Sequence, residues 1–328
     1  MLREIGNKLK QAAEEALIDA CWRQWIVLGA SGTEIHKRQA TSIVDVEQLI
    51  LFSSLLRRKE QRLELFLNWF AVVGAPLVSL QRIQGLTDRF AAEEKSQIAL
   101  FAQMALSAGD RRWKTIAKSD AEIPGSPKLK GPSIPNLLHP GALMLRFRAG
   151  FGLGAKADLM TILVGQCGHP RTVKHLVEAA AYRETSVREA LRDLTLAAFV
   201  VKSNNRPAEY IARSPWHTDT TSVRETSGSF YSEGNAELSR SSWKTLWPVL
   251  SFLHDCMTLF DTTDSEELSE YIFYSKFRDV LETYRDDLVL LGIVLPHTVP
   301  TNSDFSDVWT KIMHQSVDAV TDWLAENL

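Results

Sequence analysis

Hydrophobic positions recur at helical spacing through most of this chain. Before residue 118 the pattern predicts helices at 46–56, 62–73, 79–90 and 91–108. Ser42 and Asp45 have the three-residue spacing of a capping box directly before the first of these helices, and Gly74 ends the second. We therefore expect an all-helical N-terminal domain over residues 1–118.

A similar pattern returns near the C-terminus. Helical stretches are predicted at 242–260, 266–291 and 304–324. Pro248 is expected either to kink the first stretch or to delay its start. Residues 243–328 contain 5 Lys/Arg and 15 Asp/Glu, so we expect an acidic C-terminal helical domain over residues 242–328. Its apolar stripes are expected to form a core and, in part, a dimer interface.

The central residues 156–213 combine three shorter helical patterns with two strands. The expected inward positions are Leu159, Ile162, Leu163 and Gln166 in the first pattern, Val173, Leu176, Val177 and Ala180 in the second, and Val187, Leu191, Leu194 and Ala198 in the third. Thr185 or Ser186 is expected to cap the third helix. Strands predicted at 199–203 and 208–212 are joined by the turn sequence Asn204-Asn205-Arg206-Pro207 and form a hairpin.

Two segments of the central region carry a resemblance to a known superfamily. The sequence Thr185-Ser-Val-Arg-Glu-Ala-Leu-Arg-Asp-Leu194, followed by Ala198-Phe-Val-Val201, is similar to the recognition helix and its run into the wing in winged helix-turn-helix regulators of bacteria. Phe199 stands where many such proteins have Gly. The resemblance implies a winged helix-turn-helix domain over residues 143–216 that reads the DNA major groove with helix 185–197.

The resemblance also implies which side chains contact double-stranded DNA. Base edges would be met by Thr185, Ser186, Arg188, Glu189 and Arg192, phosphates by Lys202, Arg206 and Arg213, and DNA also by Arg183 in the turn before the helix. Arginine donates two parallel hydrogen bonds to guanine O6 and N7, worth roughly 1–3 kcal/mol of discrimination. The carboxylates of Glu184, Glu189 and Asp193 oppose DNA contact unless they pair with Arg188 and Arg192 at helical spacing.

Charge and composition divide the chain in the same way. The net charge is −3, whereas residues 143–213 contain 11 Lys/Arg and 6 Asp/Glu. Residues 119–142 hold five of the chain's 12 prolines and are expected to form a linker. A second connection, rich in Ser, Thr and Gly, is expected at 217–241. Any DNA contact is therefore expected from the centre of the chain, alone or together with the N-terminal part, with the acidic part turned away.

Cysteine content and hydropathy restrict the location. Cys21, Cys167 and Cys256 are few, odd in number and widely spaced, which excludes a disulfide framework and fits a reducing cytoplasm. The first 15 residues lack the apolar core of a secretion signal, and no run approaches the roughly 18 apolar residues of a membrane span. We expect a cytoplasmic protein with no membrane partner.

Several segments contain residues of the types found in enzyme or metal sites. Gly150-x-Gly152-x-x-Ala155 is a degenerate dinucleotide fingerprint that would follow a strand at 143–147, but no second strand with an acidic end comes after it. Cys167, His169 and His175 lack a fourth zinc ligand. His254, Asp255 and Cys256 occupy adjacent helical positions, which are expected to diverge. The carboxylates of Asp264, Glu266, Glu267, Asp286 and Asp287 lack calcium-loop spacing. We expect no enzyme activity, no cofactor and no metal.

Two hypotheses of function follow from the sequence. The first is a sequence-specific transcriptional regulator, a repressor or autoregulator, that binds DNA as a homodimer. The second is a protein-interaction module, such as an antitoxin-like regulatory partner, whose acidic C-terminal helices bind a basic surface while the central segment is scaffold. An autoregulating antitoxin would combine the two.

Overall fold

The computed structural model describes residues 2–30, 39–117, 132–213, 241–265, 269–296 and 305–328, with the side chains of residues 2, 262–265 and 305 excepted. Most of the two expected connections, residues 119–131 and 217–240, lies outside the described residues.

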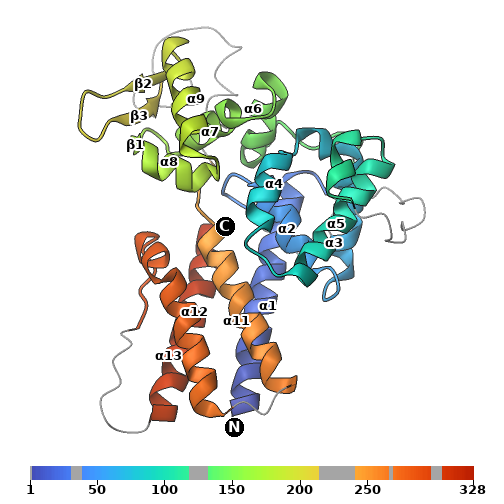
Figure 1. Cartoon of the computed structure of the whole chain (residues 1–328), viewed down its shortest axis with the longest axis vertical. Helices are drawn as coiled ribbons and strands as arrows, with labels where there is room; N and C mark the ends of the chain where they lie inside the picture. Colours follow the sequence, from blue (N-terminus) through green and yellow to red (C-terminus); the bar gives the residue numbers. More distant parts are fainter. Residues whose placement is uncertain (1, 31–38, 118–131, 214–240, 266–268, 297–304) are drawn as a thin grey trace. The chain divides into compact units, whose positions relative to one another are not determined.

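The described part of the chain is mainly helical, as the sequence predicts (Figure 1). The α-helices are α1 Leu2–Val27, α2 Val46–Leu56, α3 Gln61–Val73, α4 Leu80–Thr87, α5 Ala92–Ser107, α6 Leu143–Phe151, α7 Ala155–Gly165, α8 Val173–Ala180, α9 Glu184–Leu196, α11 Trp247–Ser265, α12 Glu270–Leu290 and α13 Phe305–Asn327. The short 3₁₀ helices are η1 Ala75–Leu77, η2 Arg111–Thr115 and η3 Pro140–Ala142. The strands are β1 Arg171–Thr172, β2 Val200–Lys202 and β3 Glu209–Ala212.

The three strands form one small antiparallel sheet in the order β1-β3-β2. Strands β2 and β3 pair as the expected hairpin, with Val201 opposite Ile211. Strand β1 pairs with the other edge of β3, where Arg171 lies opposite Tyr210. No alternation of apolar and polar residues predicts β1, because two residues are too short to show a period.

Contacts divide the chain into two compact units. The first compact unit contains Met1–Cys21 and Thr245–Leu328, and the second contains Trp22–Lys244. The first therefore combines the start of the chain with the region expected as an acidic C-terminal domain. The second places the remaining N-terminal helices and the central segment, which the sequence assigns to separate domains, in one body.

Backbone hydrogen bonds between distant segments explain why the second compact unit is continuous. Val44 donates to the carbonyl of Gly141 at 2.8 Å, and Trp243 donates to the carbonyl of Gly165 at 2.8 Å. A side chain at Gly165 would lie 2.9 Å from the backbone nitrogen of Trp243, so this close approach requires glycine. Residues at the ends of both expected connections are therefore packed into the second compact unit.

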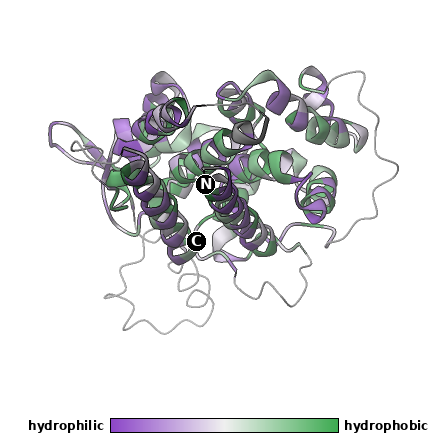
Figure 2. Ribbon diagram, turned by 90° about the horizontal axis from the view of Figure 1, so that it is seen from below, coloured by the Kyte–Doolittle hydropathy of each residue, from purple (hydrophilic) through white to green (hydrophobic). Residues whose placement is uncertain are grey.

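Aromatic side chains fill the core between α1, α2 and α3. Trp25 lies 5.3 Å from Phe70 and Trp22 lies 4.8 Å from Phe66 between ring centroids, both in edge-to-face geometry. The buried indole of Trp25 donates to Ser53 Oγ at 2.8 Å. Figure 2 shows hydrophobic and hydrophilic residues side by side on many of the helices, as expected for helices with one buried face.

In the first compact unit, α11, α12 and α13 pack against one another. Pro248 is the second residue of α11, so it marks the start of this helix and does not kink it. Ser269 caps α12 by accepting from the backbone nitrogen of Ile272, which places the start of α12 at Glu270 and not at residue 266.

The starts of α2 and α6 in the second compact unit differ from the patterns considered for them in the sequence. The cap of α2 is Asp45, whose side chain accepts from the backbone nitrogen of Gln48, and not a Ser42 box. Residues 143–147 belong to α6 and form no strand, because their apolar positions continue into a helix that reaches Phe151. The dinucleotide fingerprint thus lacks even its first strand.

Candidate nucleic-acid interface

Helices α8 and α9 are joined by a tight turn. The side chain of Thr172 caps α8 by accepting from the backbone nitrogen of His175. Ala181 ends the helix in the left-handed conformation, with φ of 54°. Tyr182 is buried, and α9 begins after Arg183. The expected cap at Thr185 or Ser186 is wrong, since Arg183 holds this position and makes no side-chain cap.

The buried face of α9 matches the apolar pattern except at its end. Val187, Leu191 and Leu194 are buried as predicted. Ala198, expected to point inward, is exposed, because the helix has already ended and this residue has a φ of 61°. Phe199 donates its backbone N–H to the carbonyl of Leu194 at 2.9 Å, which completes the left-handed ending. The glycine-type position is thus residue 198, one residue before Phe199.

The opposite face of α9 is exposed and polar. Thr185, Arg188, Glu189 and Arg192 are exposed there, whereas Ser186 is half-buried. The side chains of Arg188 and Arg192 are 62% and 76% exposed. The residues that the sequence assigns to base contact therefore share one accessible helix face, with Ser186 at its edge.

Glu184 and Asp193 form ion pairs, but only Glu184 does so at the expected helical spacing, and no ion pair is formed by Glu189 among the described residues. Arg188 Nε donates to Glu184 Oε1 at 2.7 Å across one helical turn. Asp193 lies 3.5 Å from Arg192 Nε and 3.0 Å from Lys156 Nζ on α7. The bond from Lys156 holds the pKa of Asp193 below its ordinary value. Much of the negative charge on this helix is therefore neutralised locally.

A groove of about 680 Å³ runs between α8, the start of α9 and the β2–β3 hairpin. Lys174, Arg188 and Lys202 line it from three different elements, together with the carboxylates of Glu178 and Glu184. Lys174 was not among the residues predicted from the sequence. Its exposed place between Val173 and Leu176 of an amphipathic helix is the signal that marks it.

The hairpin and the residue after it carry three exposed cations, of which Lys202 lines the groove. Lys202 lies on β2, Arg206 lies in the connecting loop, and Arg213 follows β3; all three are exposed. Within the described part of the chain, these three residues make no ion pair. The hairpin loop is drawn in the purple of hydrophilic residues in Figure 2. Cations without a protein partner are available to an anionic ligand.

A second set of charges lies in the interior of the same compact unit. This buried ion cluster consists of Asp45, Glu47, Arg82, Arg148 and Asp158, contributed by α2 and its cap, α4, α6 and α7. Arg148 forms paired hydrogen bonds to Asp158 at 2.7 and 2.9 Å and to Glu47 at 2.6 and 2.9 Å. Arg82 donates to Asp45 at 2.5 Å and also contacts Glu47. Five charged groups are thereby buried with ionic partners.

Neutral donors balance the excess carboxylate of the buried ion cluster. Tyr182 donates its hydroxyl to Asp158 Oδ2 at 2.9 Å, and the backbone of Ser79 donates to Glu47 Oε1 at 2.8 Å. Burial opposes ionisation of Asp158, but Arg148 and Arg82 outweigh it and keep its pKa below the ordinary value. Burial and the nearby Asp158 raise the pKa of Tyr182. Asp158 is therefore ionised while Tyr182 remains a donor.

The sequence prediction missed this cluster. Arg148 and Asp158 lie among mostly apolar helical neighbours, which is a usable signal for a buried charge, whereas Arg82 lies between Gln81 and Gln84 and gives no such signal. No local pattern states which of them pair, because Glu47 and Arg148 are 101 residues apart.

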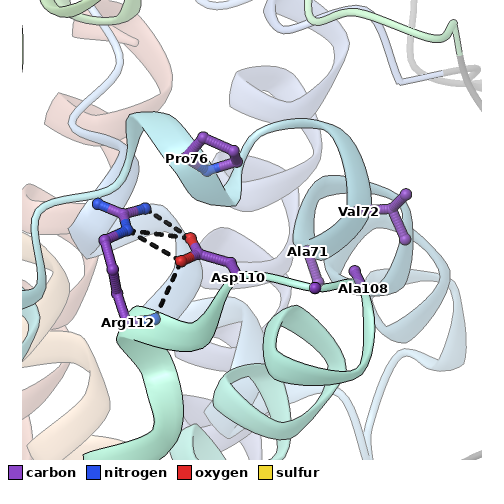
Figure 3. A pocket seen from close by; sticks show the side chains of 7 residues that line it. Ala71, Val72, Pro76, Ala108, Asp110 and Arg112 are labelled. Carbon is purple, nitrogen blue, oxygen red and sulfur yellow. Dashed lines mark hydrogen bonds and ion pairs between the residues drawn. The ribbon is translucent and has the colours of Figure 1, made fainter.

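A second hollow, of about 560 Å³, lies where α3, η1 and the end of α5 meet (Figure 3). Figure 3 shows Asp110 and Arg112 turned toward each other at its side, joined by hydrogen bonds as short as 2.6 Å. Arg112 keeps the pKa of Asp110 below its ordinary value. These two charges satisfy each other, so this hollow presents little polar chemistry to a ligand.

The residues considered for enzyme or metal chemistry are placed as follows. His254 and Asp255 approach to 3.4 Å, so the expectation that they diverge is wrong, and Tyr284 donates to the same carboxylate at 2.7 Å. Burial raises the pKa of the Cys256 thiol, which opposes formation of a nucleophilic thiolate. Among the described residues no group of three His, Cys, Asp or Glu is arranged to hold a metal. The side chains of Asp264, Glu266 and Glu267 lie outside the described residues.

Comparisons with known proteins return no relatives: no protein-family model, curated protein or solved structure matches this chain. In the described residues, no helix has the length and apolar content needed to span a membrane.

Proposed function

We propose that residues 143–213 form a winged helix-turn-helix and that the protein is a sequence-specific DNA-binding regulator of transcription. In this proposal α9 enters the major groove and the β2–β3 hairpin is the wing. The observation that carries it is the convergence of Lys174, Arg188 and Lys202, from three elements, along one groove beside the exposed face of α9.

The residues divide into two roles by their position. Arg188 and Arg192 lie on the exposed face of α9, where a fork of donors reaches the O6 and N7 acceptors of guanine. Lys174, Lys202 and Arg206 flank this face on α8 and the hairpin, where cations attract phosphate without sequence preference. The first set supplies selectivity and the second supplies salt-dependent affinity.

The ion pairs on α9 are compatible with this role. Glu184 and Arg188 are 58% and 62% exposed, so their pairing is worth little in water and exchanges readily for a DNA contact. Glu189 is also exposed and can accept from the amino group of cytosine. In this proposal the acidic helices of the first compact unit stay off the DNA and contribute to a homodimer that reads a two-fold site.

The test begins with selection of bound sequences from a random duplex library by the full-length protein. Binding of the selected duplex and of a shuffled duplex is then followed by fluorescence anisotropy over a series of salt concentrations. Combined Arg188→Ala and Arg192→Ala substitutions should weaken selected binding at least about 30-fold, since each guanine contact is worth roughly 1–3 kcal/mol. Arg206→Ala should lower the affinity for both duplexes alike and make that affinity less dependent on salt concentration.

The matched control carries Lys276→Ala and Arg278→Ala on α12, which remove the same charge from exposed positions of the first compact unit. This control should bind as the unchanged protein does. Failure to enrich any sequence, with weak and equal binding of both duplexes in all variants, would overturn the proposal and favour the protein-interaction hypothesis.

A further inference from the structure

The turn between α8 and α9 sets the angle between these two helices. It contains Ala180, Ala181 and Tyr182, and the left-handed conformation of Ala181 costs a non-glycine residue roughly 1–2 kcal/mol. Such a conformation persists only where surrounding contacts enforce it. The contacts at this turn come both from α7 of the central segment and from α4, which lies outside it.

Two side chains hold the turn from either side. Arg82 of α4 donates from Nε to the carbonyl of Ala180 at 2.9 Å, at the end of α8. Tyr182 donates to Asp158 of α7 at 2.9 Å, and its hydroxyl lies 3.4 Å from Ser79 Oγ at the cap of α4. The turn is thus bonded to α4 at its start, through Ala180, and to α7 at its end, through Tyr182.

These bonds are rigid because Arg82 is itself fixed. Its two terminal nitrogens are engaged by Asp45 and Glu47 of the α2 region, which leaves Nε directed at the turn. The guanidinium is completely buried, and in a low-dielectric interior a change of partner is costly. The position of the turn therefore depends on α2 and α4, which are more than 90 residues away in sequence.

We infer that Arg82 and Tyr182 are positioning residues, which act through the α8–α9 turn to orient α9 for DNA reading. The N-terminal helices of the second compact unit are then part of the DNA-reading body and not a separate domain. The DNA part of this inference rests on the proposed function, whereas the positioning of the turn does not.

The test compares Tyr182→Phe with Ser53→Ala. Tyr182→Phe keeps the ring and removes one buried hydroxyl, and Ser53→Ala removes one buried acceptor, that of the Trp25 indole, far from the turn along the chain. Tyr182→Phe should lower the affinity for the selected duplex about tenfold, the equivalent of one misplaced base contact. It should change the affinity for the shuffled duplex less than about twofold. Ser53→Ala should lower the melting temperature and leave both affinities unchanged.

Hydrogen exchange of residues 178–190 in the free protein supplies a readout that needs no DNA. Tyr182→Phe should raise exchange in this segment selectively, and Ser53→Ala should not. Arg82→Lys, which keeps the charge and removes the Nε bond, should act as Tyr182→Phe does. If exchange in this segment is unchanged, or affinity for the selected duplex is kept, the inference is wrong. If exchange rises but the unchanged protein selects no DNA, the positioning stands and the proposed function fails.

Discussion

Arginine meets carboxylate in two regions of the second compact unit, under opposite conditions. On α9, Arg188 pairs with Glu184 while both side chains remain more than half exposed. In the buried ion cluster, Arg148 pairs with Glu47 and Asp158 with no exposure of the three side chains. The chemical groups are the same, and the solvent around them differs.

The difference teaches which pairs are available for recognition. Water screens the exposed pair, so its separation costs little and an incoming phosphate or base can replace one partner. Removal of one partner from the buried set leaves an uncompensated charge in a low-dielectric interior. The exposed arginines therefore suit reversible binding, and the buried ones suit a fixed architecture.

The largest expected effect is on stability in the buried ion cluster. Arg148→Met should lower the free energy of unfolding by about 3–5 kcal/mol, because Glu47 and Asp158 lose a shared partner. Urea unfolding measures it. The same substitution at the exposed Arg188 should change stability by no more than about 0.5 kcal/mol. A loss below about 1 kcal/mol for Arg148→Met would remove the distinction between the two regions.

The next effect is a pH dependence that belongs to Asp158. Its pKa is lower in the folded protein than the ordinary value of 3.8, so the folded state binds fewer protons than the unfolded state as the pH falls toward that value. The stability contributed by ionised Asp158 is fully present at pH values well above 3.8. It is lost as the pH drops through the pKa that Asp158 has in the folded state. The difference in unfolding free energy between the unchanged protein and Asp158→Asn, about 1.5–3 kcal/mol at pH 7, should narrow in acid. A difference that stays constant between pH 7 and pH 3 would contradict the assignment.

A smaller effect on stability is expected at the C-terminal end of α9, from substitutions that change no charge. Ala198→Gly should stabilise the protein by about 0.5–1 kcal/mol, because glycine adopts the φ of 61° without steric cost. Ala197→Gly, one residue earlier at a φ of −74°, should instead destabilise it by up to about 1 kcal/mol. Thermal unfolding reports both signs. Equal signs would show that residue 198 does not set the end of the helix.

The smallest expected effect on stability is at the exposed pair. Glu184→Gln should change the free energy of unfolding by no more than about 0.5 kcal/mol, yet it releases Arg188 and should strengthen binding to both selected and shuffled duplexes. Glu178→Gln removes the same charge from an exposed residue of α8 that has no ion-pair partner in the described part of the chain. Anisotropy should show a larger gain for Glu184→Gln. Equal gains in affinity for the two variants would mean that net charge alone sets the affinity, and that release of Arg188 contributes nothing.

Local features of the α8–β3 segment follow from the sequence. Val187, Leu191 and Leu194 repeat at helical spacing and are buried, and Arg188 and Arg192 are exposed between them. The turn residues at 204–207 predict the hairpin that joins β2 to β3. The errors of the sequence prediction are small where residues adjacent in sequence set the conformation. The left-handed helix end, for example, lies at Ala198, one residue from the position at which a Gly was expected.

Only the tertiary structure decided how these parts are joined. The pairing of Arg148 with Glu47, the bond from Arg82 to Ala180 and the packing of Trp243 against Gly165 each connect residues far apart in the chain. Helical and strand periods report which face of an element is buried, and they carry no information on which distant element covers it. For that reason the sequence by itself determined most of the helices, the β2–β3 hairpin and the exposed arginines of α9. Strand β1 and the joining of N-terminal and central helices around buried charges required the folded chain.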